Sequence, residues 1–220
     1  MKIVPYTSVL ILIIALKTSF LFSQIEKSAY YEDIDGKRLS KESFSEKYHS
    51  KPDGYGYFSL IFENDTCYIR KLHRRKALGR LNLNVLDSLK FLYPKMTKSH
   101  KFTIFQYYPG KDICNVGHIA PNSHPNHNRN LRKVKKIQKK FDALNYFVYK
   151  LGSDLNYDKI KRINWILDKN AVLERLFFQY HYMCGSFVVI NNVDGRYIAV
   201  FSEYGISTIE KVLDEMSNTK

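Results

Sequence analysis

The sequence predicts an α/β fold in which a central mixed sheet of about four to five strands is flanked by helices and preceded by an N-terminal β/α extension. From Lys101 onward the predicted elements follow the order β-α-β-α-β-β-α, and helical crossovers between strands imply parallel pairing with helices on the sheet faces. The turn at residues 192–195 joins two strands as in an antiparallel hairpin. The 14 Phe and 17 Tyr residues supply the apolar surface that such a core requires.

The first 24 residues have the layout of a secretory signal peptide. A lysine near the start precedes an apolar core from Val9 to Leu16, and Ser23 offers a small residue for cleavage. The apolar run is interrupted at Lys17 and is shorter than the roughly 20 residues that span a bilayer. We therefore expect export to the periplasm or the extracellular space, with no stable membrane span after cleavage; an uncleaved anchor is the alternative.

The next segment combines strands, a helix and a hairpin. A turn at Asp35-Gly36 precedes a helix for which Ser40 is the expected N-cap. Alternating apolar residues predict two strands around the turn Asn64-Asp65. A short helix is expected from about Asn84 and ends at Pro94. These elements form the predicted extension.

The remaining chain shows stronger periodicity. Runs of β-branched and aromatic residues predict strands, and helical spacing of apolar residues predicts helices. Ser207 is the expected N-cap of the last helix, and Asn170 that of the helix before the hairpin. The expected strands are 101–108, 146–150, 186–190 and 196–201, and the expected helices are 129–145, 157–167, 171–181 and 207–216. The chain is thus divided into a signal peptide (1–24), the extension (25–98) and a domain (99–220).

Positive charge dominates the chain. The formal net charge is +14, and removal of Lys2 and Lys17 with the signal peptide leaves +12. This charge favours acidic partners such as nucleic acid, anionic lipid or anionic glycans, although it also serves solubility alone.

Cations cover one side of the helix predicted over 129–145, opposite an apolar stripe, so this helix is a candidate polyanion-binding surface, with a merely solvated face as the alternative. No aromatic platform interleaves with these cations, so nucleic acid is the less expected partner. A protein or another acidic surface is the expected partner, and the sequence does not identify it. The candidate residues are Arg132, Lys133, Lys136, Lys139 and Lys140.

Two segments carry a resemblance. The stretch "KFTIFQYYPGKDICN" resembles the strand that leads to the redox loop of thioredoxin-like proteins. The stretch "CGSFVVINNVDGRYIAVFSEYGISTIEKVLDEM" resembles their C-terminal half, with a strand, an Asp-Gly hairpin, a second strand and a closing helix. The chain also resembles exported bacterial proteins of unknown role that share "YYPGKDICN" and "LFFQYHYMCGSFVVI". The resemblance covers roughly residues 99–220 and implies a thioredoxin-like fold.

The chain departs from the thioredoxin pattern at the redox site. Thioredoxins carry Cys-x-x-Cys, which pairs two thiols and lowers the pKa of the attacking one. Cys114 has no cysteine three residues before or after it. Residues 184–186, where the family places a cis-proline, contain no proline. The resemblance therefore implies an exported thioredoxin-like protein without dithiol catalysis, acting as a binding or structural module. The alternative is a thiol–disulfide redox enzyme that uses Cys114, with Cys184 as the resolving thiol.

The resemblance also suggests how the cysteines are arranged. In a thioredoxin-like fold the loop after the first strand lies beside the residue that precedes the third strand, which implies that Cys114 and Cys184 are neighbours. In an exported protein they are expected to form a structural or an exchangeable disulfide, with two free thiols as the alternative. Cys67 is expected to be a small buried residue of a strand.

Two further hypotheses concern the loop after residue 108. His118, His124 and His127 follow Cys114, but their spacing lacks the two tight pairs that zinc sites usually have, and we expect no metal or other cofactor.

The stretch "VGHIAP" resembles part of the Arg-Gly-His-x-Ala-Pro motif of nonspecific metal-dependent nucleases. By that resemblance His118 would activate water, and Asn126, Asn128 or Asn130 would bind magnesium. Asn115-Val116 stands where that motif has Asp-Arg, which argues against hydrolysis.

Overall fold

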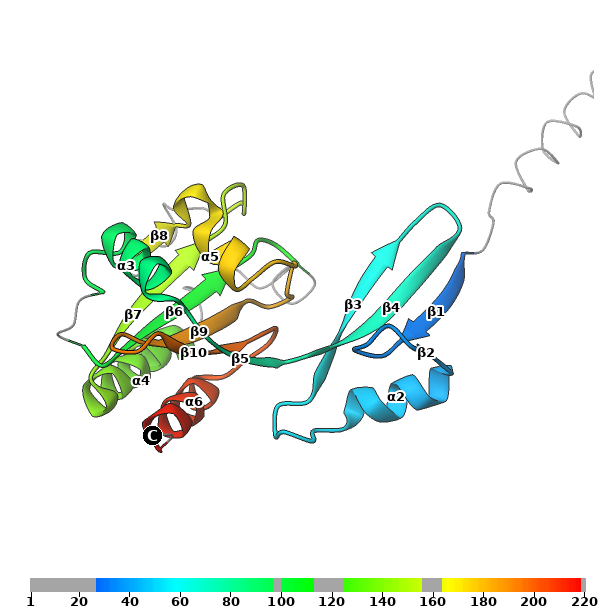
Figure 1. Ribbon diagram of the computed structural model, residues 1–220, viewed down its shortest axis with the longest axis horizontal. Coiled ribbons are helices and arrows are strands. Elements are labelled where there is room, and N and C mark those ends of the chain that lie inside the picture. Colours follow the sequence, from blue (N-terminus) through cyan, green and yellow to red (C-terminus); the bar gives the residue numbers. More distant parts are fainter. Residues whose placement is uncertain (1–26, 97–99, 113–124, 156–163, 219–220) are drawn as a thin grey trace, which may run out of the picture. The chain divides into compact units, whose positions relative to one another are not determined.

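The computed structural model describes residues 27–96, 100–112, 125–155 and 164–218, so the predicted signal peptide lies outside the described residues. In the described part the chain is a mixed α/β protein with a four-stranded and a six-stranded mixed sheet and five α-helices (Figure 1). It divides into two compact units. The described part of the first comprises residues 27–51 and 57–73, and that of the second comprises 52–56 and the described residues from 74 onward.

The first unit pairs one helix with the four-stranded sheet, in the order β2-β1-β4-β3. Strand β1 is antiparallel to β2 and parallel to β4. The Ser40 side chain accepts the Ser43 N–H, which confirms the predicted N-cap of the helix. Asn64 closes the predicted hairpin turn by accepting the Cys67 N–H. The elements are β1 (Ser28–Glu32), β2 (Arg38–Leu39), α2 (Lys41–His49), β3 (Tyr57–Glu63) and β4 (Cys67–Arg74).

The second unit is built on the six-stranded sheet, in the order β5-β10-β9-β6-β7-β8. Strands β6, β7 and β8 are mutually parallel, whereas β9 is antiparallel to both β6 and β10, and β10 to β5. The elements are β5 (Lys76–Arg80), α3 (Leu83–Leu92), β6 (Phe102–Tyr108), α4 (Pro125–Phe141), β7 (Ala143–Tyr149), β8 (Trp165–Leu167), a single 3-10 turn (Lys169–Ala171), α5 (Val172–Leu176), β9 (Ser186–Asn191), β10 (Arg196–Val200) and α6 (Ile206–Asn218).

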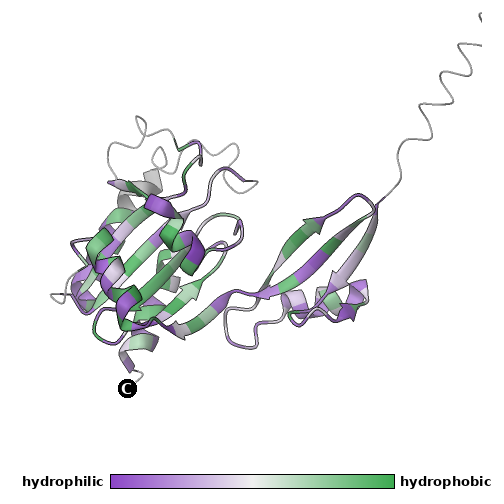
Figure 2. Cartoon of the chain, turned by 45° about the horizontal axis from the view of Figure 1, so that its top comes forward, coloured by the Kyte–Doolittle hydropathy of each residue, from purple (hydrophilic) through white to green (hydrophobic). Residues whose placement is uncertain are grey.

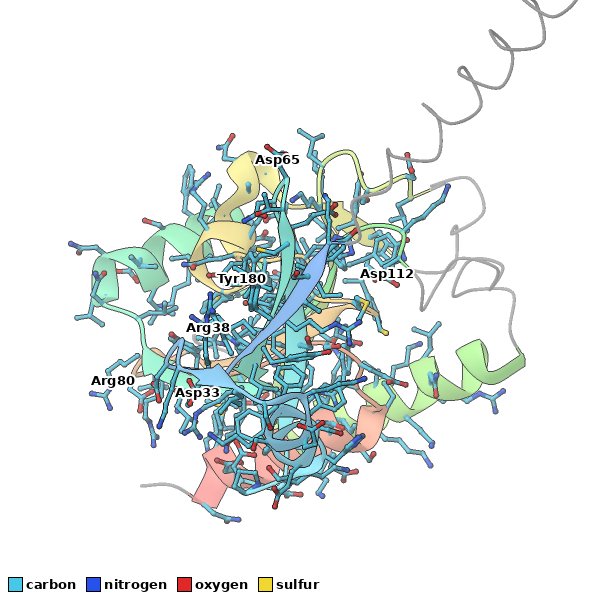
Figure 3. The ribbon with its side chains drawn as sticks, turned by 90° about the vertical axis from the view of Figure 1, so that its right-hand side faces the viewer. Asp33, Arg38, Asp65, Arg80, Asp112 and Tyr180 are labelled. Carbon is cyan, nitrogen blue, oxygen red and sulfur yellow. The ribbon has the colours of Figure 1, made fainter. Side chains whose placement is uncertain are left out.

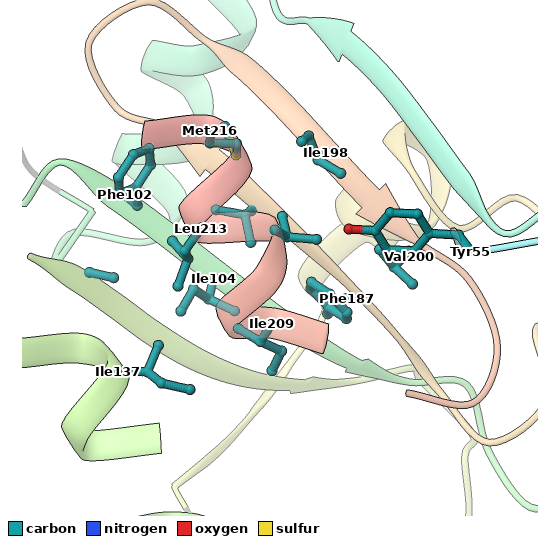
Figure 4. Packing of buried hydrophobic residues seen from close by; sticks show 13 residues of the cluster. Tyr55, Phe102, Ile104, Ile137, Phe187, Ile198, Val200, Ile209, Leu213 and Met216 are labelled. Carbon is teal, nitrogen blue, oxygen red and sulfur yellow. The ribbon is translucent and has the colours of Figure 1, made fainter. Parts of the chain in front are cut away.

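Helices cover both faces of this sheet. Figure 1 shows α4 and α6 along one face and α3 and α5 over the other. Hydrophobic residues run along the central strands (Figure 2), and β9 is buried along its whole length because both faces are covered. Helix α6 packs Ile209, Leu213 and Met216 against the sheet (Figure 4). None of the helices in the described ranges is both long and apolar enough to cross a membrane.

The structure confirms the predicted α/β class and corrects several elements. The six-stranded sheet exceeds the expected four to five strands because β5 and β8 extend its two edges. Residues 165–167 form strand β8 and not the end of a helix, since they pair with β7. Helix α6 begins at Ile206, so Ser207 lies in its first turn and is not its N-cap. The predicted Asn170 cap is also wrong, because the buried Asp168 carboxylate accepts the first free N–H groups of α5.

Candidate functional site

The candidate site lies where β6 ends and β9 begins. These strands are antiparallel neighbours, and their last paired residues at this end are Tyr107 and Ser186. Beyond them, the Asp112 carboxylate accepts a hydrogen bond from the Cys184 backbone N–H, with 2.7 Å between Oδ2 and N. The Asp112 side chain is 6% exposed, and its Oδ2 lies 3.6 Å from His181 Nε2. Figure 3 labels Asp112. A buried carboxylate therefore ties the segment after β6 to the segment before β9.

The backbone before β9 is left-handed at two consecutive residues. Cys184 has a φ of 66° and Gly185 a φ of 94°, and the described residues contain no cis peptide bond. A Cβ on Gly185 would lie 3.0 Å from the Tyr107 carbonyl oxygen, so a side chain there would be strained and crowded. Where the resemblance implies a cis-proline, this chain has a Cys-Gly pair that brings the backbone close to the end of β6.

The three cysteines of the chain differ in state. Cys67 is a free, half-buried residue of β4. Cys184 is disulfide-bonded and does not titrate. Cys114 lies outside the described residues. The described rim of the site therefore presents no free thiol.

A cavity of about 540 Å³ opens beside Cys184. Its wall is drawn from β6, α4, β7, β8 and the segments that precede β9 and begin α6, and it combines aromatic and aliphatic side chains with a few polar groups. Tyr108 and Phe147 pack around Trp165 in one cluster with Leu131. The lining residues are Gln106, Tyr107, Tyr108, Asn130, Leu131, Lys133, Val134, Phe147, Trp165, Cys184, Gly185, Tyr204, Gly205, Ile206 and Ser207.

Three side chains next to the cavity are linked by hydrogen bonds, with Gln106 of β6 between Asn145 of β7 and Tyr204. The buried Gln106 donates from Nε2 to Asn145 Oδ1 over 2.7 Å and accepts at Oε1 from Tyr204 Oη over 3.2 Å. Burial raises the pKa of Tyr204, and the pKa of Tyr108 is raised by burial and by the nearby Asp112 and Asp154 charges. Both phenols therefore stay neutral at ordinary pH and act as hydrogen-bonding groups rather than as bases.

The predicted basic surface is present on α4. Arg132, Lys133, Lys136 and Lys139 are exposed, and within the described part of the chain they make no ion pair. Lys140 differs from them, because its Nζ lies 2.8 Å from Glu210 and 3.8 Å from Asp214 of α6. Four of the five predicted cations thus form a surface that no acid of the described residues neutralises.

The metal and nuclease hypotheses fall largely outside the described residues. His118 and His124 lie in the undescribed segment, and the side chains of His127, Asn126 and Asn128 are not described either. Asn130 is exposed and lines the cavity. No group of three potential metal-ligating side chains occurs among the residues that the structure describes.

Sequence reasoning missed most of the cavity. Its lining comes from six separate segments, and no local pattern joins them. The one available signal was Gln106, the single amide of the strand "FTIFQYY", whose other residues are β-branched or aromatic. An amide in a buried strand needs hydrogen-bond partners, which here are Asn145 and Tyr204. That pattern therefore predicts a polar feature beside β6, though not its shape.

Comparison with known proteins gives no family for this chain: no protein-family model matches it, and no curated protein matches it significantly.

Proposed function

We propose that this chain is an exported, thioredoxin-like binding module without dithiol catalysis. The support for the fold is the arrangement of four neighbouring strands. Strands β6 and β7 are parallel and joined through α4, and β9 and β10 are antiparallel and followed by α6, in the order β7-β6-β9-β10. This is the arrangement that the resemblance implies. The support for export is the composition of the first 24 residues.

The observation that carries the proposal is the hydrogen bond between Asp112 and the Cys184 backbone N–H. Cys114 follows Asp112 by two residues, which span at most about 7 Å, so the length of the chain allows Cys114 to reach Cys184. The Cα atoms of disulfide-bonded cysteines are about 4.4–6.8 Å apart. We infer that Cys114 and Cys184 form a structural bridge across the place where related proteins hold their redox pair. A single bridge that closes a long loop leaves no second thiol for dithiol chemistry.

Peptide mapping of the non-reduced protein tests this assignment. We expect a peptide that links Cys114 to Cys184, with Cys67 alkylated as a free thiol. In an insulin-reduction assay the protein should show no turnover above a boiled sample. Turnover that Cys114→Ser abolishes would instead establish the redox alternative, and a link through Cys67 would overturn the proposed bridge.

The four α4 cations without an ion pair among the described residues favour a second candidate function, the binding of a polyanion. Cations that contact a polyanion release its counterions on binding, so the affinity falls as salt rises. We expect binding to a heparin oligosaccharide to weaken with salt, and Lys136→Gln to weaken it further. Lys140→Gln is the matched control, because Glu210 and Asp214 already neutralise that cation. Equal losses in both variants, or binding insensitive to salt, would exclude this surface as the binding site.

A further inference from the structure

The cavity beside Cys184 has the size and lining of a small-molecule site. Small-molecule pockets usually enclose about 300–1,000 Å³ and combine apolar and aromatic walls with a few polar groups. The cavity here, at about 540 Å³, has Tyr108, Phe147 and Trp165 on one side and Val134 and Ile206 among its other lining residues. Such walls favour a flat ring or a short acyl chain over a strongly hydrated ligand.

The described lining of the cavity contains a cation and no carboxylate, while the carboxylates of Asp112 and Asp154 lie near the lining residue Tyr108. The cation is Lys133, which forms no ion pair with described residues. Helix α6 begins at this wall with Ile206 and Ser207, and its first turn contains no acidic residue. The free N–H groups at the start of a 13-residue helix carry partial positive charge, which favours an anion nearby.

From the volume and lining of the cavity, together with Lys133 and the start of α6, we propose that the cavity binds a small amphipathic carboxylate. Its aromatic or short acyl body would lie against Tyr108, Phe147 and Trp165, and its carboxylate would lie toward Lys133 and the start of α6. This inference rests on the proposed role as a binding module and gives that module a ligand class. It does not depend on how the cysteines pair, so the peptide mapping and the ligand experiment can fail separately.

Trp165 makes the experiment specific, because it is the single tryptophan of the chain. The probe is anilinonaphthalene sulfonate, an aromatic anion whose emission is excited by energy transfer from tryptophan. We expect saturable transfer, and displacement of the dye by phenylacetate at a concentration about tenfold lower than by phenylacetamide, the neutral analogue of the same shape. Equal displacement by the acid and the amide, or dye binding without transfer from Trp165, would overturn the proposal.

Two variants of α4 separate the cavity from the general field of the helix. Lys133→Met removes the cation that lines the cavity, and we expect the preference for phenylacetate over phenylacetamide to shrink to about twofold or less. Lys136→Met removes an exposed cation of the same helix that does not line the cavity, and it should keep the preference. Equal effects of the two substitutions would refute a specific carboxylate site.

A thermal unfolding scan controls for folding, and it should show the same cooperative transition in both variants as in the parent. The remaining alternative occupant is a polypeptide segment. Displacement of the dye by an extended apolar peptide at a lower concentration than by any small carboxylate would assign the cavity to a protein partner and overturn the proposed ligand class.

Discussion

Removal of the proposed bridge should lower the stability of the second unit by a predictable amount. A link between Cys114 and Cys184 closes a loop of about 70 residues, for which the chain-entropy relation gives about 4 kcal/mol of stabilisation. If the free energy of unfolding falls by about 2 kcal/mol per molar urea, Cys184→Ser should lower the midpoint of urea unfolding by about 2 M. For a unit of this size the same loss corresponds to a decrease in Tm of about 8–16 °C.

The decisive comparison is between single and double variants. Replacement of either cysteine abolishes a disulfide. The same loss of stability is therefore expected for Cys114→Ser, Cys184→Ser and the double variant. Cys67→Ser is the control for a free thiol, and it should change the free energy of unfolding by about 0.5 kcal/mol or less. Losses that add in the double variant, or a loss below about 1 kcal/mol in the singles, would refute the bridge.

Three further changes test the fold. Thr103→Val removes the buried hydroxyl that donates to Asn192 Oδ1 over 2.9 Å, and the free energy of unfolding in urea should fall by about 1–3 kcal/mol; a change below about 0.5 would contradict this. Gly195→Ala should cost at least about 1 kcal/mol more than Gly152→Ala in the same assay. Both glycines have positive φ, but only at Gly195 would a Cβ lie 2.7 Å from a backbone oxygen, so equal losses would contradict the clash. Asp33→Asn should destabilise the first unit at neutral pH, and this difference should disappear as the pH falls below about 4.

The sign of the pH effect follows from the hydrogen bonds of Asp33. The Lys37 N–H is the largest influence and lowers the pKa of this carboxyl, and the Asp35 N–H and the Lys47 charge lower it further against the opposing effect of burial. Figure 3 labels Asp33 and Arg38, which lie on either side of this turn. A carboxyl with a lowered pKa in the folded state stabilises above its unfolded pKa, and this stability is lost as the pH falls through the folded value. A difference that grows on acidification would show the opposite linkage.

The sequence was most informative where a segment is buried on two faces or carries its own turn chemistry. Strands β6 and β9 consist almost wholly of β-branched and aromatic residues, which suit a sheet covered on both sides. Strand β5 was missed, because "KALGR" is short and basic and becomes a strand only by pairing with β10. Gly79 illustrates that β5 depends on its contacts with β10, since a Cβ at this position would lie within 2.5 Å of the Tyr197 ring. Strand β8 was taken for helix because periodicity does not distinguish a three-residue apolar run.

The rim of the candidate site could be predicted in part. Chain order and resemblance indicated that Cys184 precedes a strand beside β6, and the position of β9 next to β6 fits this expectation. The carboxylate that fixes the approach, Asp112, carried no signal, because an aspartate after a strand is usually read as turn chemistry. The apolar stripe of the basic helix was readable as Val134 and Ile137, both of which are buried. The sequence did not indicate which of the cations form ion pairs, because Lys140 is paired with Glu210, which lies 70 residues further along the chain.

The division of the chain into two units has a practical consequence for truncation. Residues 52–56 belong to the second unit, although the hairpin that follows them belongs to the first. Tyr55 in this short segment is buried in the main core of the second unit, where its ring lies under the ammonium groups of Lys76 and Lys211. A fragment that starts at residue 74 would therefore lack a core aromatic ring and leave a hole beside α6. The chain passes between the units at three junctions, 51/52, 56/57 and 73/74. Limited proteolysis should therefore require three cuts to separate the units, and a singly nicked chain should still migrate as one particle.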